Sequence, residues 1–233
     1  MLSYRPSAAR GHANHGWLDS FHTFSFADYH DPARMNFRAL RVINEDRIAG
    51  GGGFPTHAHQ DMEIVTYLVD GALEHKDSTG TGAVILPGDA QRMSAGTGIR
   101  HSEANASKTA PAHLLQIWLM PSRTGIAPGY EQVTLPKVVQ GDSRLDLVAS
   151  PEGGPEAVKI TSDAAIHRAT LAAEGKLDVP LAAGRYAWVQ AVKGNAVVNG
   201  QSMAPGDGLA LSDVSGLTMA SDEGAELLVF DLG

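Results

Sequence analysis

The chain has 233 residues, of which 43% are hydrophobic and 19% are charged. This balance is typical of a folded protein and excludes a disordered chain, which has too little apolar surface to form a core. The formal net charge of −8 argues against neutralising phosphates, so no direct contact with nucleic acid is expected. Cysteine is absent, so a transition metal would have to be bound by imidazole, carboxylate or backbone oxygen.

The N-terminal segment MLSYRPSAARGHANHG contains no apolar stretch that could serve as a signal peptide. No later window approaches the roughly 20 apolar residues of a membrane span. We therefore expect a soluble monomer in the cytoplasm that does not bind a membrane.

Glycine and proline, 26 and 12 in number, divide the chain at short intervals into segments rich in β-branched residues. Helical periodicity is scarce, and Ser162–Glu174 is the one segment that could form a helix. The pattern predicts an all-β sandwich or barrel with many short strands.

His57 and His59 are separated by one residue and precede the apolar segment Ile64–Val69. In an extended chain, side chains at positions i and i+2 point to the same face, so both imidazoles can converge on one point. An isolated pair of this kind is also common on exposed strands, where it binds nothing.

His101 and Glu103 repeat this spacing, directly after the glycine-rich turn Ala95–Gly98. Two such pairs on neighbouring strands would supply three imidazoles and one carboxylate, which suit Fe(II), Mn, Co, Ni, Cu or Zn. The sequence therefore predicts one divalent metal ion bound by His57, His59, His101 and Glu103. Four protein ligands would leave coordination positions for water or substrate.

The chain contains an internal repeat, since VDGALEHKDSTGTGAVILPGD from Val69 aligns with VKGNAVVNGQSMAPGD from Val192. Both copies read as a hairpin followed by the turn Pro-Gly-Asp. Two similar β domains are therefore predicted, with the boundary near Pro136 in the segment Pro121–Gly141. The expected domains are residues 1–135, which hold the metal, and 136–233, which do not.

The second copy serves as an internal control for the metal site. Extending the alignment without gaps places four residues opposite the predicted ligands, namely Pro180, Ala182, Met219 and Ser221. None of them is a plausible metal ligand. The fold therefore does not require histidine at these positions, which favours function over packing.

Three motifs carry a resemblance to a known family: GHANHGWLDSFHTFSFADYHDP from Gly11, FPTHAHQDMEIVTYLVDGALEHKDS from Phe54 and MSAGTGIRHSE from Met93. They closely resemble the pirin family of bicupins, most of all its bacterial members that act as quercetin 2,3-dioxygenases. The resemblance extends over the whole chain and implies two cupin β-sandwich domains. It also implies a single metal ion, with Fe(II) the expected one, on the same four residues.

In the general cupin pattern, a glutamate after the two histidines is a further ligand, and Glu63 occupies that position. Pirins do not usually use it, so three roles are open for Glu63: a ligand, a hydrogen-bond partner of a ligand, or a buried structural residue. His12, His15 and His22 lie in the first motif and either face the substrate or pack across the mouth of the barrel. Phe24, Phe26, Phe54 and Met93 could form an apolar mouth, although each could equally belong to the core. His75, His113 and His167 are expected to be structural.

The resemblance implies a metal-dependent dioxygenase that opens the heterocycle of a flavonol or related enolisable polyphenol. A carboxylate, either Glu103 or Glu63, would accept the proton of the substrate hydroxyl. The alternative is a metal-dependent regulator that binds proteins without turnover, because eukaryotic pirins share these motifs and act as cofactors of transcription factors. A metal-stabilised structural domain is a third possibility.

Overall fold

The computed structural model describes residues 1–233, and almost all of its regular structure is β. The N-terminal half contains β1 (Leu2–Arg5), the 3-10 helix η1 (Ser7–Ala9), β2 (Gly11–Asn14), β3 (Leu18–His22), β4 (Leu40–Ile48), β5 (Gly53–His59), β6 (Glu63–Asp70), β7 (Leu73–Asp77), β8 (Gly82–Ile85), β9 (Asp89–Ser94), β10 (Ile99–Asn105), β11 (Ala112–Leu119) and β12 (Gly129–Thr134). The C-terminal half contains β13 (Arg144–Ser150), β14 (Val158–Lys159), β15 (Ala164–Leu171), β16 (Gly175–Pro180), β17 (Tyr186–Lys193), β18 (Ala196–Val198), β19 (Gln201–Met203), β20 (Gly208–Leu211), β21 (Gly216–Ser221) and β22 (Ala225–Leu232). The chain has no helix long and apolar enough to cross a bilayer.

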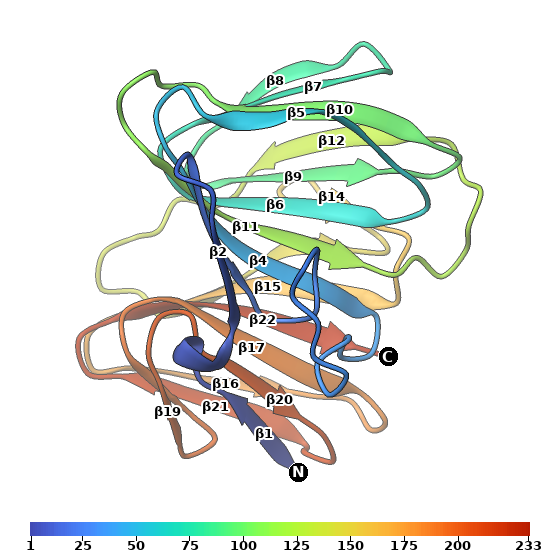
Figure 1. Cartoon of the computed structure of the whole chain (residues 1–233). Helices are drawn as coiled ribbons and strands as arrows, with labels where there is room; N and C mark the ends of the chain where they lie inside the picture. Colours follow the sequence, from blue (N-terminus) through green and yellow to red (C-terminus); the bar gives the residue numbers. More distant parts are fainter.

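The strands form four sheets that pair into two sandwiches (Figure 1). The N-terminal sandwich has a seven-stranded sheet, β12-β9-β6-β11-β4-β3-β2, and a four-stranded sheet, β5-β10-β7-β8. The C-terminal sandwich has the sheets β1-β20-β17-β22-β15-β13-β14 and β16-β21-β18-β19. The two seven-stranded sheets lie in the middle of the molecule, and the four-stranded sheets lie outside them.

The two sandwiches repeat the same topology. The strand orders β9-β6-β11-β4 and β5-β10-β7-β8 recur as β20-β17-β22-β15 and β16-β21-β18-β19. Gly71 and Gly194, which the sequence alignment matched, both follow the long central strand with positive φ values of 83° and 68°. The predictions of an all-β fold and of an internal repeat are therefore confirmed.

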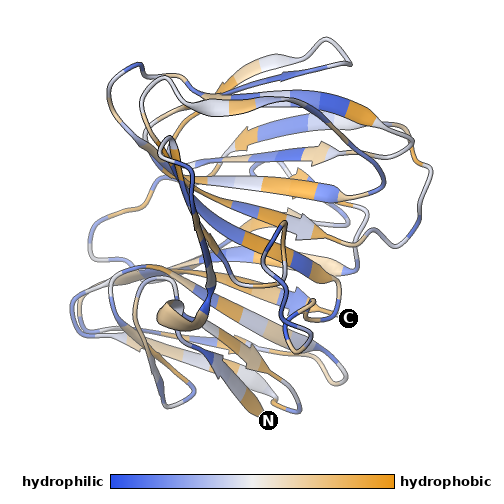
Figure 2. Cartoon of the chain, viewed as in Figure 1, coloured by the Kyte–Doolittle hydropathy of each residue, from blue (hydrophilic) through white to orange (hydrophobic).

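The largest core cluster lies between the two central sheets and contains side chains from both halves, such as Val65, Ile117, Trp188 and Phe230. Figure 2 shows apolar segments along these central strands. A second cluster fills the C-terminal sandwich. Strand alternation explains this arrangement, because every second residue of a central strand faces the other half and the residues between face the interior of their own sandwich.

Two expectations from the sequence need correction. Ser162–Glu174 is not a helix, because residues 164–171 form β15 and pair with both β13 and β22. The division at residues 135/136 also places β1 with the N-terminal domain, whereas β1 pairs with β20 at the edge of the C-terminal sheet. The rest of that boundary stays a prediction.

Candidate metal centre

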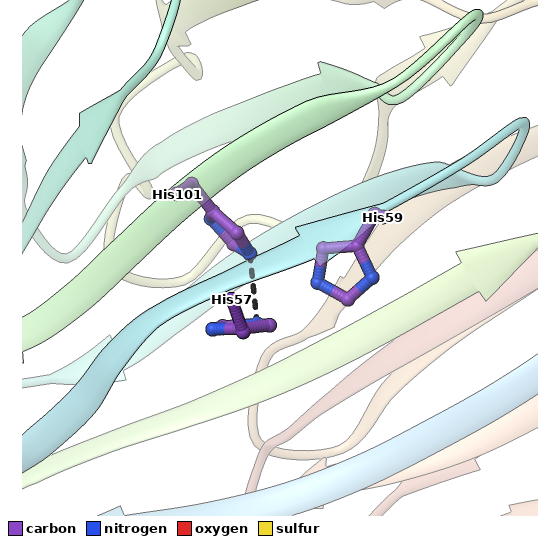
Figure 3. A group of neighbouring side chains, drawn as sticks. All are labelled: His57, His59 and His101. Atoms are coloured by element: carbon purple, nitrogen blue, oxygen red, sulfur yellow. Dashed lines mark hydrogen bonds between the residues drawn. The ribbon is translucent and has the colours of Figure 1, made fainter.

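Two neighbouring antiparallel strands position three histidines (Figure 3). His57 on β5 pairs directly with His101 on β10, and His59 lies two residues further along β5 on the same face. One nitrogen from each of the three rings lies within 4.8 Å of one from each of the others. The predicted convergence of the two pairs of residues is therefore present for the imidazoles.

The turn that precedes β10 fixes the end of this strand. Gly96 has a φ of +48°, and a side chain there would place its Cβ 2.2 Å from the carbonyl oxygen of Ile126. The Gly96 carbonyl accepts a hydrogen bond from the amide of Asp61, just after His59. The glycine therefore holds the start of β10 against the end of β5.

Hydrogen bonding selects the tautomer that a metal ion needs. His57 Nδ1 lies 2.9 Å from the carbonyl oxygen of Pro55, so this nitrogen carries the proton and donates it. The lone pair is then on His57 Nε2, which lies 3.1 Å from His101 Nε2. A backbone acceptor of this kind is how proteins commonly orient a metal-binding histidine.

Glu103 is buried on β10, two residues after His101, and its Oε2 accepts a hydrogen bond of 2.8 Å from the Gln116 amide. Its Oε1 is buried without a partner, as is His59 Nε2. Such orphaned atoms carry a desolvation cost that a bound cation would remove. The donor set therefore fits a divalent transition metal. In this side-chain arrangement Glu103 groups with His101 and His75 rather than with all three histidines.

Burial determines the charge of the cluster. Burial, and to a lesser extent the neighbouring His57, lowers the pKa of His101 to about 3 and that of His59 to about 4. Burial also raises the pKa of Glu103, which the hydrogen bond from Gln116 opposes. The imidazoles of His59 and His101 are therefore neutral near pH 7, which is the form that binds metal.

Glu63 lies outside this cluster. It is the first residue of β6 and shares a face with Val65 and Tyr67, which point to the other half of the molecule. Its carboxylate accepts hydrogen bonds from Thr161 at 2.7 Å and Ser94 at 3.0 Å. The sequence prediction that Glu63 contributes to catalysis is therefore not supported, because strand alternation directs it away from the metal centre.

A cavity of about 730 Å³ opens beside the cluster. Besides His57, His59, Glu103 and Gln116, its wall contains residues of the N-terminal motif and of the central sheet: His12, Ala13, His15, Trp17, Leu18, Ser20, His22, Phe26, Ala27, Asp28, Tyr29, Asn44, Asp46, Phe54, Pro55 and Trp118. The wall therefore contains both aromatic and polar side chains.

The three N-terminal histidines all line this cavity, and two of them also make side-chain hydrogen bonds. His12 bonds to Asp19 at 2.6 Å and stacks on Phe21, and His22 bonds to Asn44 at 2.9 Å. Of the aromatic and apolar candidates, Phe26 and Phe54 line the cavity. Phe24 and Met93 are buried core residues instead.

His113 and His167, which were expected to be structural, lie away from the cavity. His113 bonds to Glu45 at 2.9 Å, and His167 is largely buried within β15. His75 was also expected to be structural, yet its ring lies 5.3 Å from that of His101, and it bonds to Asp77 at 3.0 Å. It is thus part of the surroundings of the centre.

Sequence reasoning also missed Asp46 and Gln116, two polar residues of the cavity wall. A signal was present for Gln116, which interrupts the apolar segment of β11, AHLLQIWL, whereas Asp46 lies within the polar run NEDR of β4. A polar side chain at a position that faces the interior indicates a polar cavity there.

The strand ladders correct the internal control. Leu73, two residues after Gly71, pairs with Asn105. Ala196, two residues after Gly194, lies opposite Ser221 in the register of β18 with β21, so Asn105 corresponds to Ser221. From this match, β21 corresponds to β10, so Leu217 and Met219 correspond to His101 and Glu103. The strand paired with β21 is β16, whose Val179 and the following Leu181 correspond to His57 and His59.

These four residues differ by one or two positions from those in the ungapped alignment, because the loops between the strands differ in length in the two halves. All four are apolar and belong to or pack against the core of the C-terminal sandwich. The same scaffold is thus filled by hydrocarbon in one half and by ligand-forming side chains in the other.

Comparison with known proteins agrees with the presence of two similar domains. The family described as Pirin matches residues 4–119, and the Quercetinase C-terminal cupin domain matches residues 147–232. The chain is 48% identical over 232 residues to the quercetin 2,3-dioxygenase of Escherichia coli K12, with 100% of this chain and 99% of that protein covered. It is 38% identical over 231 residues to a pirin-like protein of Caulobacter vibrioides, with 99% of each covered.

Solved structures show the same relationship. The crystal structure of YhhW from Escherichia coli has a TM-score of 0.95 at 48% identity and covers 100% of this chain and 98% of its own. The structure of bacterial pirin YhhW in complex with nickel(II) has a TM-score of 0.94 at 48% identity, with 100% and 99% covered. The chain therefore belongs to the pirin family.

Proposed function

We propose that this protein is a metal-dependent dioxygenase that opens the heterocycle of a flavonol or a related enolisable polyphenol. The observation that carries the proposal is the cavity of about 730 Å³ into which His57, His59 and Glu103 project. Its size is in the range of pockets that enclose a drug-sized ligand. The quercetin 2,3-dioxygenase name of a relative at 48% identity supports the same substrate class.

His57, His59, His101 and Glu103 would hold one divalent ion, with Fe(II) as the expected metal. The nickel(II) complex of the bacterial pirin from Escherichia coli supports a first-row transition metal at this place. A bound ion would lower the pKa of a hydroxyl that coordinates it and would polarise a neighbouring carbonyl group.

The remaining wall of the cavity would bind and orient the substrate. Trp17 packs edge-on against Phe54, with ring centroids 5.2 Å apart, and Trp118 packs edge-on against His59 at 4.9 Å. These surfaces suit flat aromatic rings, which they would stack and shield from water. Gln116 would keep Glu103 turned toward the centre through the hydrogen bond described above.

Dioxygen uptake across a panel of flavonols tests this function. Wild-type protein loaded with Fe(II) or Ni(II) should consume many equivalents of dioxygen per chain with at least one flavonol. His57→Ala and His101→Ala should lose this activity. If the loaded wild type binds flavonols without consuming dioxygen, the enzyme proposal is wrong and the regulator without turnover is favoured.

A further inference from the structure

A carboxyl group that no predicted function uses lies in the wall of the cavity. Asp46 on β4 is only 3% exposed, and Ser20 on the neighbouring strand β3 donates a hydrogen bond to its Oδ1. Its other oxygen, Oδ2, has no hydrogen-bond partner and remains accessible to solvent. It therefore faces the cavity that His57 and Glu103 also line.

Asp46 differs from the structural carboxylates that are buried elsewhere in the chain. Glu45 is paired with Arg10 at 2.8 Å, Arg47 at 2.9 Å and His113 at 2.9 Å. Asp146 is paired with Arg144 and Arg168, and Asp207 accepts bonds from two backbone amides and from Tyr4. Asp46 has one hydroxyl donor and no cationic partner. A buried carboxyl without compensation is costly to fold, which is the usual mark of a functional group.

The C-terminal sandwich again provides a control. Asp46 pairs with Leu114 on β11, and the corresponding pair in the second half is Ala169 with Leu227. Ala169 is buried in the apolar core of that half. The fold therefore does not require a carboxyl at this position, and the carboxyl is found in the half that carries the cluster of histidines.

We propose that Asp46 accepts a hydrogen bond from a hydroxyl of the substrate in this cavity and then takes its proton. This role rests on the proposed function and deepens it, since it supplies the proton acceptor that Glu63 cannot be. The O–H bond of the substrate breaks, the proton passes to Asp46 Oδ2, and the substrate keeps the electron pair as an anion. Glu103 is then free to act as a ligand.

The surroundings of Asp46 suit this exchange. Burial raises the pKa of Asp46 to about 7, and the negative charges of Glu103 and Glu45 raise it too, while the bond from Ser20 lowers it. A proton acceptor is most effective when its pKa lies near the working pH. The other titratable groups in the wall of this cavity are His12, His15, His22, Asp28, Tyr29, His57 and His59.

Two variants separate hydrogen bonding from proton transfer. Asp46→Asn keeps an acceptor oxygen but cannot take a proton, so kcat for a flavonol should fall by about 100-fold or more while KM changes little. Asp46→Ala, which copies Ala169, should raise KM as well. Glu63→Gln, a buried carboxyl on the opposite face, is the matched control and should keep the wild-type kcat.

The second readout is the absorption spectrum of 3-hydroxyflavone bound under nitrogen, because ionisation of its hydroxyl shifts the band to longer wavelength. Wild-type protein should bind the anion near pH 7, and Asp46→Asn should bind it only at higher pH, with metal content unchanged. If Asp46→Asn has the wild-type kcat and spectrum, the role of Asp46 is wrong and the proposed function stands. If the metal-loaded wild type shows neither uptake of dioxygen nor a bound flavonol, the proposed function itself fails and this role with it.

Discussion

His57 Nε2 and His101 Nε2 lie 3.1 Å apart at directly paired positions of two antiparallel strands. Because His57 Nδ1 donates to Pro55, His57 Nε2 can only accept, and in the metal-free chain His101 Nε2 donates to it. A bound ion would instead take the lone pairs of both nitrogens and would stabilise only the folded chain. Metal removal should therefore destabilise the fold. With free metal at 100 times its Kd, the bound ion would contribute about 2.7 kcal/mol to the free energy of unfolding.

Thermal melting with and without EDTA measures this contribution. The wild type should melt several degrees lower in EDTA, whereas His57→Ala and His101→Ala should show no such shift. His30→Ala replaces an exposed histidine outside the cavity and should respond to EDTA like the wild type. An equal EDTA shift in all four proteins would contradict a stabilising ion at this place.

Gln116 should control the affinity of the centre for metal. Gln116→Val copies Val229, the corresponding residue in the C-terminal sandwich, and removes the donor that holds Glu103. Loss of such a partner of a ligand typically weakens metal binding by about 10- to 100-fold. Competition titration with a chromophoric chelator measures the affinity. An unchanged Kd would show that Gln116 does not orient Glu103 toward the ion.

The metal-free protein should lose stability as the pH falls. The pKa of His101 is about 3 in the folded chain, below the ordinary value of 6.5, so the unfolded state binds the extra proton between these limits. The contribution of His101 is therefore complete above about pH 6.5 and is lost progressively toward pH 3.

His101→Leu, which copies Leu217, removes this proton uptake. Urea unfolding at pH 7 and pH 5 in the presence of EDTA measures the effect. The loss of stability between the two pH values should be smaller in the variant than in the wild type. A larger loss in the variant would contradict the lowered pKa of His101.

Thr161 joins the two halves of the molecule through its bond to Glu63 at 2.7 Å. Thr161→Val should leave the buried carboxylate with Ser94 as its only donor and lower the free energy of unfolding by about 1–3 kcal/mol. Metal content should not change, because Glu63 faces away from the centre. Loss of metal in Thr161→Val, measured by elemental analysis, would place Glu63 nearer to the ion than its hydrogen bonds indicate.

The sequence predicted the fold and the histidine cluster because both depend on local periodicity. Alternation on β5 and β10 brings His57, His59 and His101 to one face, and the glycines at 71 and 194 reveal the repeat. Of the roles left open for Glu63, the buried hydrogen-bonded one could not be singled out, because a spacing cannot show which face of the next strand is buried against another domain. The 164–171 segment was misjudged because apolar residues on both faces of a central strand obscure its alternation.

Asp46, Gln116 and His75 could not be assigned from the sequence because their roles depend on pairing between distant strands. Asp46 reaches the cavity through pairing of β3 with β4, and Gln116 reaches Glu103 across the interior of the sandwich. Gln116 stands alone among apolar residues in β11, whereas Asp46 and His75 lie among other polar residues of β4 and β7. Only the folded structure shows that Asp46 and Gln116 line one cavity and that His75 lies beside His101.

The central claim is that His57, His59, His101 and Glu103 bind one divalent ion that remains open to a ligand. The most direct measurement is the metal content of the wild type and of a His57→Ala/His101→Ala double variant, purified without added metal and reloaded with Ni(II). The account predicts about one ion per chain in the wild type, with a spectrum that changes on addition of azide or a flavonol, and almost none in the variant. Equal metal content in the two proteins would contradict it.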